Sequence, residues 1–227
     1  MFGSIGDLII PPRCLVCGSP QDLRYGLCGK CLSLIRSIPK PLCDLCGSPI
    51  GSPGICLTCQ THNPPFNRII SSVEYNGLIK EIIHAYKYRK ATVFKKFLAS
   101  LVLDSIYEEQ VSFDILTFVP LHWTRMIQRG YNQSALITKE MAQRMRVQIR
   151  YDVIKKNMNT RAQVGLNRKD RRRNVRGSFT ASNVHNKSVL VVDDVVTTGE
   201  TASEIAQTLK NAGAKYVVFA SVARAVS

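Results

Sequence analysis

Two adjacent carboxylates, Asp193 and Asp194, stand directly before a hydroxyl-rich turn that contains Gly199. Ionised carboxylates are strong acceptors for the neighbouring hydroxyls of a ribose. The turn and the helix predicted after it supply hydroxyls, unpaired N–H groups and the positive end of a helix dipole, which all favour a phosphate. This order of groups indicates a nucleotide or sugar-phosphate site. The turn residues that we expect around the phosphate are Val195, Val196, Thr197, Thr198, Gly199, Glu200 and Thr201.

The chain just before the carboxylates has to place them at the edge of a sheet. Residues 187–192 are mostly aliphatic and β-branched, which is typical of a buried parallel strand. Ligands of open α/β sheets bind at the carboxyl ends of such strands. Because successive side chains point to opposite faces, both aspartates can face one ligand only if the strand bends at Asp193. If it does not bend, one of the two is structural.

The chain from residue 66 onward alternates between strand and helix patterns. We expect strands at 69–75, 114–120, 187–192 and 216–222, and helices at 78–90, 91–107, 131–147 and 200–211. This alternation predicts an α/β fold with a mostly parallel sheet flanked by helices. The sequence contains neither a Gly-x4-Gly-Lys-Ser/Thr loop nor a Gly-x-Gly-x-x-Gly motif, which disfavours P-loop NTPases and dinucleotide-binding folds.

Eight cysteines between residues 14 and 59 form four Cys-x2-Cys pairs. Each pair places two sulfurs within reach of one tetrahedral ion, and four thiolates make a closed structural zinc site. Eight ligands therefore imply two structural Zn²⁺ ions, which would supply folding energy that a core-poor segment lacks. The predicted metal ligands are Cys14, Cys17, Cys28, Cys31, Cys43, Cys46, Cys56 and Cys59.

Two pairings of the cysteines remain open. In the sequential one, pairs 14/17 and 28/31 share an ion, as do 43/46 and 56/59; in the crossed one, pairs 14/17 and 43/46 share an ion. The similar gaps of about ten residues between pairs suit stacked ribbons, so we favour the sequential arrangement. Redox dithiols or disulfides are the alternative to metal.

A domain boundary is predicted near residues 63–66, where the cysteines end. We expect a double zinc-ribbon module at 1–65 and an α/β domain at 66–227. The start of the chain lacks the charge and apolar length of a signal peptide, and no run of 18 apolar residues suggests a membrane span. We therefore expect a cytoplasmic protein, peripheral at the inner membrane through partners, whose thiols stay reduced.

The net charge of +15 is concentrated in one segment. Residues 155–176 contain nine Lys and Arg and one opposing acid, Asp170. Such a block is typical of a solvated segment, and it also suits a phosphate-rich ligand or nucleic acid. The residues that we assign to nucleic-acid contact are Arg168, Lys169, Arg171, Arg172 and Arg173.

The segment Val189–Thr201 resembles the signature of type I phosphoribosyltransferases, which bind phosphoribosyl pyrophosphate (PRPP). Nearly the whole chain is similar to the ComF family. The matching motifs are the cysteine pairs, Tyr75-Asn76-Gly77, Val119-Pro120-Leu121-His122-x2-Arg125-x3-Arg129-Gly130-Tyr131-Asn132-Gln133-Ser134 and Arg161-x-Gln163-x2-Leu166-x4-Arg171-x2-Asn174-Val175-x-Gly177-x-Phe179.

The resemblance implies a phosphoribosyltransferase-like fold and a PRPP pocket. Asp193 and Asp194 would hold the ribose hydroxyls, the turn 195–201 the 5′-phosphate, and Mg²⁺ would bridge ribose and pyrophosphate. The pyrophosphate loop would follow the strand at Pro120, where the family keeps a cis peptide bond. The further residues implied around the pyrophosphate are Leu121, His122, Arg125, Arg129, Asn132 and Gln133.

Two functions stay open. The family association implies a competence factor that helps incoming single-stranded DNA across the inner membrane, with DNA and the uptake machinery, a helicase or an inner-membrane channel, as partners. The alternative is an active phosphoribosyltransferase with catalytic residues Asp193, Asp194, Arg125 and Arg129 and an unidentified acceptor. Thr197 stands where hypoxanthine-type enzymes carry an acid, which argues against that substrate class.

Overall fold

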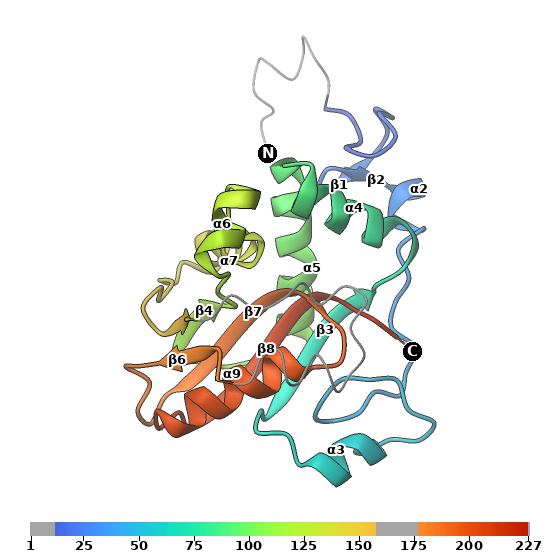
Figure 1. The fold of residues 1–227 in the computed structure, drawn as a ribbon. Helices are drawn as coiled ribbons and strands as arrows, with labels where there is room; N and C mark the ends of the chain where they lie inside the picture. Colours follow the sequence, from blue (N-terminus) through green and yellow to red (C-terminus); the bar gives the residue numbers. More distant parts are fainter. Residues whose placement is uncertain (1–11, 158–176, 227) are drawn as a thin grey trace.

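The computed structural model describes residues 12–157 and 177–226. Its centre is a parallel four-stranded sheet in the order β3-β8-β7-β4 (Figure 1). The strands are β3 (Arg68–Glu74), β4 (Ile115–Phe118), β7 (Ser188–Val196) and β8 (Tyr216–Arg224). Long aliphatic runs make the two central strands buried on both faces, as a parallel sheet requires. The predicted α/β architecture is confirmed.

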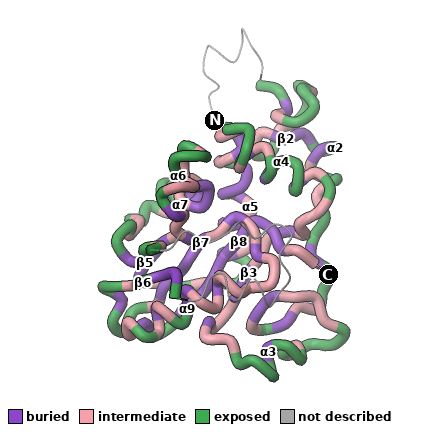
Figure 2. Tube along the Cα trace, in the orientation of Figure 1, coloured by how far each residue is buried: buried purple, intermediate pink, exposed green. Residues whose placement is uncertain are grey.

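Helices cover both faces of the sheet. One face carries α4 (Gly77–Tyr88), the 3₁₀ turn η1 (Thr92–Phe94), α5 (Lys95–Glu108) and α7 (Gln133–Met145), and the opposite face carries α9 (Glu200–Asn211). The short α6 (Trp123–Arg129) lies beyond α7 and is largely exposed (Figure 2). A hairpin of β5 (Ile154–Lys156) and β6 (Phe179–Ala181) lies beside the sheet, where β6 contacts α9.

The two zinc ribbons lie at separate places in the molecule (Figure 1). The first contains β1 (Leu23–Arg24), β2 (Leu27–Cys28) and α2 (Gly29–Leu32), and lies near α4. The second includes α3 (Leu57–His62), which carries Cys59, and lies near β3 and the end of β8. Cys14, Cys28 and Cys31 belong to the apolar cluster of the α4–α5–α7 face, whereas Cys43, Cys46 and Cys59 belong to that of the α9 face.

Strand β7 is longer than its sequence predicts. It continues through the two aspartates to Val196, which pairs with Arg224 of β8, because β8 supplies pairing partners along that whole length. The expectation that the strand ends at residue 192 is therefore wrong. The predicted helix at 200–211 agrees with α9, and Gly213 after it has a φ of +88°.

The strand also bends where the aspartates stand. Leu190 and Val192 pack toward α4, α5 and α7, and Val191 packs toward α9. Beyond the aspartates this alternation is inverted, because Val195 contacts the α4–α5–α7 cluster and Val196 lies in the α9 cluster. The irregularity falls between residues 192 and 195, which is the bend that both aspartates need in order to face the same side.

Candidate phosphoribosyl site at the end of strand β7

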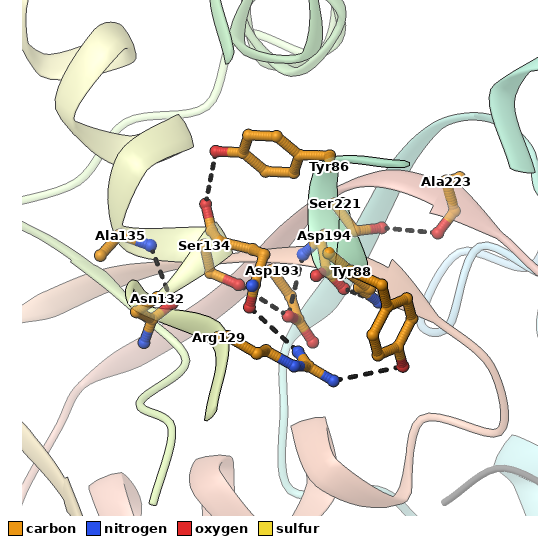
Figure 3. Close-up of polar contacts among 12 residues, drawn as sticks. Tyr86, Tyr88, Arg129, Asn132, Ser134, Ala135, Asp193, Asp194, Ser221 and Ala223 are labelled. Atoms are coloured by element: carbon orange, nitrogen blue, oxygen red, sulfur yellow. Dashed lines mark hydrogen bonds and ion pairs between the residues drawn. The ribbon is translucent and has the colours of Figure 1, made fainter. Parts of the chain in front are cut away.

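The two carboxylates meet side chains from two helices on one face of the sheet (Figure 3). Asp193 Oδ1 accepts hydrogen bonds from Ser134 Oγ (3.0 Å) and from the Asp194 backbone N–H (2.8 Å). Asp194 Oδ1 lies 2.7 Å from Lys87 Nζ, and both of these side chains are largely buried. The sequence motif and the ends of α4 and α7 thus converge on one cluster.

Burial and the neighbouring charge of Asp194 raise the pKa of Asp193 to about 7, although Lys87 and the hydrogen bond from Ser134 oppose the shift. The desolvation of Lys87 lowers its pKa, but the two aspartates outweigh this effect and hold that pKa above its usual value. Asp193 is therefore partly protonated near neutral pH.

The turn after β7 leads into a half-buried start of α9. Gly199 has a φ of +78°, a left-handed conformation that favours glycine, and it precedes Glu200 at the N-terminus of the helix. Thr197 and Thr198 line a cavity of about 600 Å³ on the side of the second ribbon. The amides of a helix start and these hydroxyls are groups that bind an anion.

Arg129 is held over Tyr88 at the mouth of the cluster. Its guanidinium donates to Gln133 Oε1 (3.0 Å) and to Tyr88 Oη (3.3 Å), and it lies 5.0 Å from the centre of the Tyr88 ring. Arg125 lies one helical turn before Arg129 on α6, and burial and the charge of Arg129 lower its pKa. Two adjacent cations of this kind suit a polyphosphate.

Lys156 of β5 is a site residue that the sequence analysis does not single out. Burial and the charge of Arg125 lower its pKa to about 8, while Asp193 opposes the shift. Lys156 therefore lies within electrostatic range of Arg125 and Asp193. The available signal was its position at the start of the basic segment, since periodicity does not show that β5 returns to the sheet edge.

The loop after β4 has capping roles that its sequence leaves open. His122 is buried and caps α6, with Nδ1 accepting from the Thr124 N–H (3.4 Å). Asn132 caps α7 through the Ala135 N–H (3.1 Å) and donates to the Val119 carbonyl (3.0 Å). These contacts hold the loop against α7, and Leu121 is half-buried within it.

The peptide bond before Pro120 is trans, which differs from the family expectation. The one cis bond among the described residues is Lys40–Pro41. The proposed nucleic-acid contacts at residues 168–173 lie outside the described part of the chain.

Both cysteine clusters fit zinc, and their pairing is sequential. The sulfurs of 14/17 and 28/31 lie within 4.8 Å of one another, as do those of 43/46 and 56/59. The Cys17–Cys28 and Cys46–Cys56 sulfur pairs are 3.6 Å and 3.7 Å apart. Those distances match the edge of a tetrahedron with Zn–S bonds of about 2.3 Å.

Hydrogen bonds from backbone amides stabilise the thiolate form of two of the cysteines. Burial opposes ionisation of Cys14, but hydrogen bonds from backbone N–H groups, including that of Cys28, lower its pKa to about 6. Cys43 has the same arrangement with the Cys56 N–H, and its pKa is lowered to about 7. Thiolates, not thiols, ligate zinc, so both clusters suit the ion.

Family models match the two parts of the chain. A double zinc ribbon domain matches residues 5–60, and a phosphoribosyl transferase domain matches residues 132–227. Among the described residues, no helix has the length and apolar character to cross a membrane.

Several relatives match nearly the full length of the chain. A DNA utilization protein YhgH from Salmonella typhi is 32% identical over 92% of this chain and 96% of its own. Competence protein F from Haemophilus influenzae is 28% identical over 94% and 97%, and competence protein ComFC from Streptococcus pneumoniae 26% identical over 93% and 100%. A solved glutamine phosphoribosylpyrophosphate amidotransferase from B. subtilis is 23% identical over 60% of this chain and 30% of its own, with a TM-score of 0.41.

Proposed function

Since this chain belongs to the family of the DNA utilization and competence F proteins, we propose that it binds PRPP with Mg²⁺ and handles incoming single-stranded DNA in natural transformation. The observation that carries the PRPP assignment is the bent end of β7. It presents Asp193 and Asp194 on one side and continues into the glycine turn at the start of α9.

In this proposal the carboxylates accept hydrogen bonds from the ribose hydroxyls, and the turn 195–201 donates to the 5′-phosphate. Lys87 holds Asp194 while the ligand is absent and has to share it when the ribose enters. Arg125, Arg129 and Lys156 form the cationic wall toward the pyrophosphate. Ionisation of Asp193 accompanies binding, because only the charged carboxylate accepts two hydroxyls strongly.

Mg²⁺ in this pocket would neutralise part of the ligand charge, because hard cations prefer phosphate and carboxylate oxygens. Asp193 and Asp194 are the carboxylates at the site that suit it, either directly or through the ribose oxygens. The amide of Gln133 and the cap at Asn132 hold Arg129 and the preceding loop in position for the pyrophosphate.

The handling of single-stranded DNA is supported by an aromatic and basic surface around α6. Trp123 is 64% exposed and Tyr151 is 60% exposed, and both flank the loop after β4. Tyr88, also exposed, stacks with Arg129. Exposed rings beside cations bind single strands without sequence preference, because every base can stack.

A complementation experiment tests the combined role. In a naturally competent host that depends on this gene, Asp194→Asn is expected to abolish PRPP binding and to lower transformation frequency. Unchanged transformation together with lost PRPP binding would separate the pocket from DNA uptake. Release of pyrophosphate with a labelled product in a cell extract would instead identify an active phosphoribosyltransferase.

The DNA surface has its own test. Trp123→Ala is expected to weaken single-stranded DNA binding about fivefold or more, because stacking on one ring contributes about 1–3 kcal/mol. Charge reversal at Arg171–Arg173 is expected to reduce the salt slope of binding. If neither change alters DNA affinity, direct handling of DNA by these surfaces is excluded, and the uptake machinery becomes the partner to examine.

A further inference from the structure

The second zinc ribbon is hydrogen-bonded into the strand ends that carry the phosphate turn. The Ile69 N–H of β3 donates to the Leu45 carbonyl (2.7 Å). Arg224 at the end of β8 donates to the Cys46 carbonyl (2.6 Å) and to Ser48 Oγ (2.5 Å). These bonds surround the zinc ligand Cys46, so the ribbon and two strands of the sheet share one hydrogen-bonded unit.

Arg224 is buried, with 4% of its surface exposed, and its guanidinium lies against the zinc ligand Cys46. A Zn²⁺ ion with four thiolates carries a net charge of about −2, which a buried guanidinium compensates. The zinc-loaded ribbon therefore stabilises Arg224 in its place.

Arg224 is also the β8 partner of the last β7 residue. It pairs in register with Val196, directly before Thr197, and the Ala225 N–H donates to the Val196 carbonyl (2.9 Å). Ile69 reaches from the other side, since its Cδ1 lies 3.6 Å from where a side chain on Gly199 would begin. Both ends of the turn thus touch residues that the second ribbon holds.

The cavity between ribbon and turn has walls from both. Cys46, Cys59 and Phe66 line one side, and Thr197 and Thr198 line the other. Arg224 and Ile69 are two residues that contact the ribbon on one side and lie beside the turn on the other.

We infer that the zinc-loaded second ribbon sets the conformation of the phosphate turn, with Arg224 as the positioning residue that connects them. The inference assigns this part to the second ribbon, because the cysteines of the first ribbon belong to the apolar cluster of the α4–α5–α7 face, where their contacts with the domain are apolar packing. The inference rests on the proposed binding of the PRPP 5′-phosphate by the turn. A charged hydrogen-bonded contact contributes about 1.5–3 kcal/mol, so its loss should weaken PRPP binding about tenfold or more.

A matched pair of cysteine variants tests the inference in the full-length protein. Cys59→Ser and Cys31→Ser each remove one buried thiolate, from the second and the first ribbon respectively. Zinc content, PRPP affinity by calorimetry in Mg²⁺, and hydrogen exchange of peptides covering 195–203 without PRPP are measured for both. Arg224→Lys, which keeps the charge but reaches one acceptor instead of two, is measured in the same way.

We expect Cys59→Ser to lose one zinc, to weaken PRPP binding about tenfold or more, and to speed exchange in the turn, with Arg224→Lys showing a smaller change of the same kind. Cys31→Ser should lose one zinc without either effect. Equal effects of the two cysteine variants, or protected turn amides in both Cys59→Ser and Arg224→Lys, would overturn the inference. If the wild-type protein does not bind PRPP, the proposed function fails, while the exchange data still decide whether the ribbon positions the turn.

Discussion

The two zinc ribbons have almost the same cysteine spacing but different surroundings. The first knuckle of each ends in a glycine with positive φ, Gly18 at +73° and Gly47 at +68°. A side chain on Gly18 would meet nothing within 4 Å, whereas one on Gly47 would lie 2.6 Å from the Ile69 carbonyl oxygen. Equal motifs can thus bind the same metal while only one of them is built into the sheet.

This difference shows that ligand spacing specifies the ion and not the role of the module. The first ribbon contributes apolar residues such as Leu27 to the α4–α5–α7 cluster. The second ribbon adds directional contacts, through Leu45, Cys46 and Ser48, at the edge where the sugar-phosphate site lies. Hydrogen bonds restrict the distance and angle between the groups that they join, so these contacts fix the position of the strand ends relative to the second ribbon.

The largest difference in stability between variants of the two ribbons is expected at Arg224. Arg224→Met should lower the free energy of unfolding by about 3–5 kcal/mol, because it leaves buried thiolate charge uncompensated. Arg24, in the first ribbon, is exposed and lies over the Tyr25 ring at 5.2 Å. Arg24→Met should therefore cost less than about 1 kcal/mol. Denaturant unfolding of both variants checks this, and similar losses would contradict the asymmetry.

The next largest difference in stability is expected between alanine variants of Gly47 and Gly18, the two glycines that follow the first knuckle of each ribbon. Gly47→Ala should destabilise the protein by about 2–4 kcal/mol, since a left-handed alanine costs about 1 kcal/mol and the clash with the Ile69 carbonyl adds to it. Gly18→Ala should cost about 1 kcal/mol, from the backbone alone. Thermal unfolding at saturating zinc measures both. A Gly18→Ala loss as large as that of Gly47→Ala would show that the first ribbon is packed as tightly as the second.

The pH dependence of PRPP binding should follow the carboxylates and neither ribbon. Because the pKa of free Asp193 is raised to about 7, its ionisation is completed as PRPP binds. Affinity should therefore rise about tenfold from pH 6 to pH 8, after correction for the ionisation of the ligand itself. Cys31→Ser should keep this slope. A flat profile would show that Asp193 does not change its protonation on binding.

The raised pKa of Asp193 also determines how the free energy of unfolding changes with pH. Between the ordinary carboxyl pKa of about 4 and the native value, the folded protein binds one proton more than the unfolded chain at Asp193. Its contribution to the free energy of unfolding is therefore fully present below pH 4 and is lost as the pH rises toward 7. Bound PRPP should reverse this trend.

The smallest effect is expected at the surface between the ribbons. Lys40 and Glu108 form an ion pair at 3.8 Å, with about three quarters of each side chain exposed. Glu108→Gln should change the free energy of unfolding by less than about 0.5 kcal/mol, because exposed ion pairs contribute little. Denaturant unfolding at low and high salt measures it. A larger loss would mean that surface charge, and not the core, holds the linker in place.

Much of this arrangement was readable from the sequence, where local patterns decide the structure. The period of α9 and the even cysteine spacing predicted the helix at 200–211 and the sequential zinc sites. The length of β7 was not readable, because it depends on pairing with a distant partner, β8. Its bend at Asp193 became visible only when the two apolar faces could be compared.

The positively charged residues of the site could also be predicted only in part from the sequence. Arg125 and Arg129 were expected at the pyrophosphate from the family resemblance, whereas Lys156 comes within range of Arg125 through the pairing of β5 with β6, which no local pattern specifies. Lys87 stands near the end of a helix, where a cation suits the helix dipole, and only the fold brings it to Asp194. His122 and Asn132 were expected at the pyrophosphate, and their visible contacts are helix caps.

Calorimetric titration of PRPP into the wild-type protein and into Asp193→Asn, with and without Mg²⁺, tests the central claim most directly. We expect Mg²⁺-dependent binding to the wild type and about 100-fold weaker binding to Asp193→Asn, since hydrogen bonds to a charged group contribute about 1.5–3 kcal/mol each. Equal affinities for the two proteins, or no binding of PRPP to the wild type, would contradict a phosphoribosyl site at the end of β7.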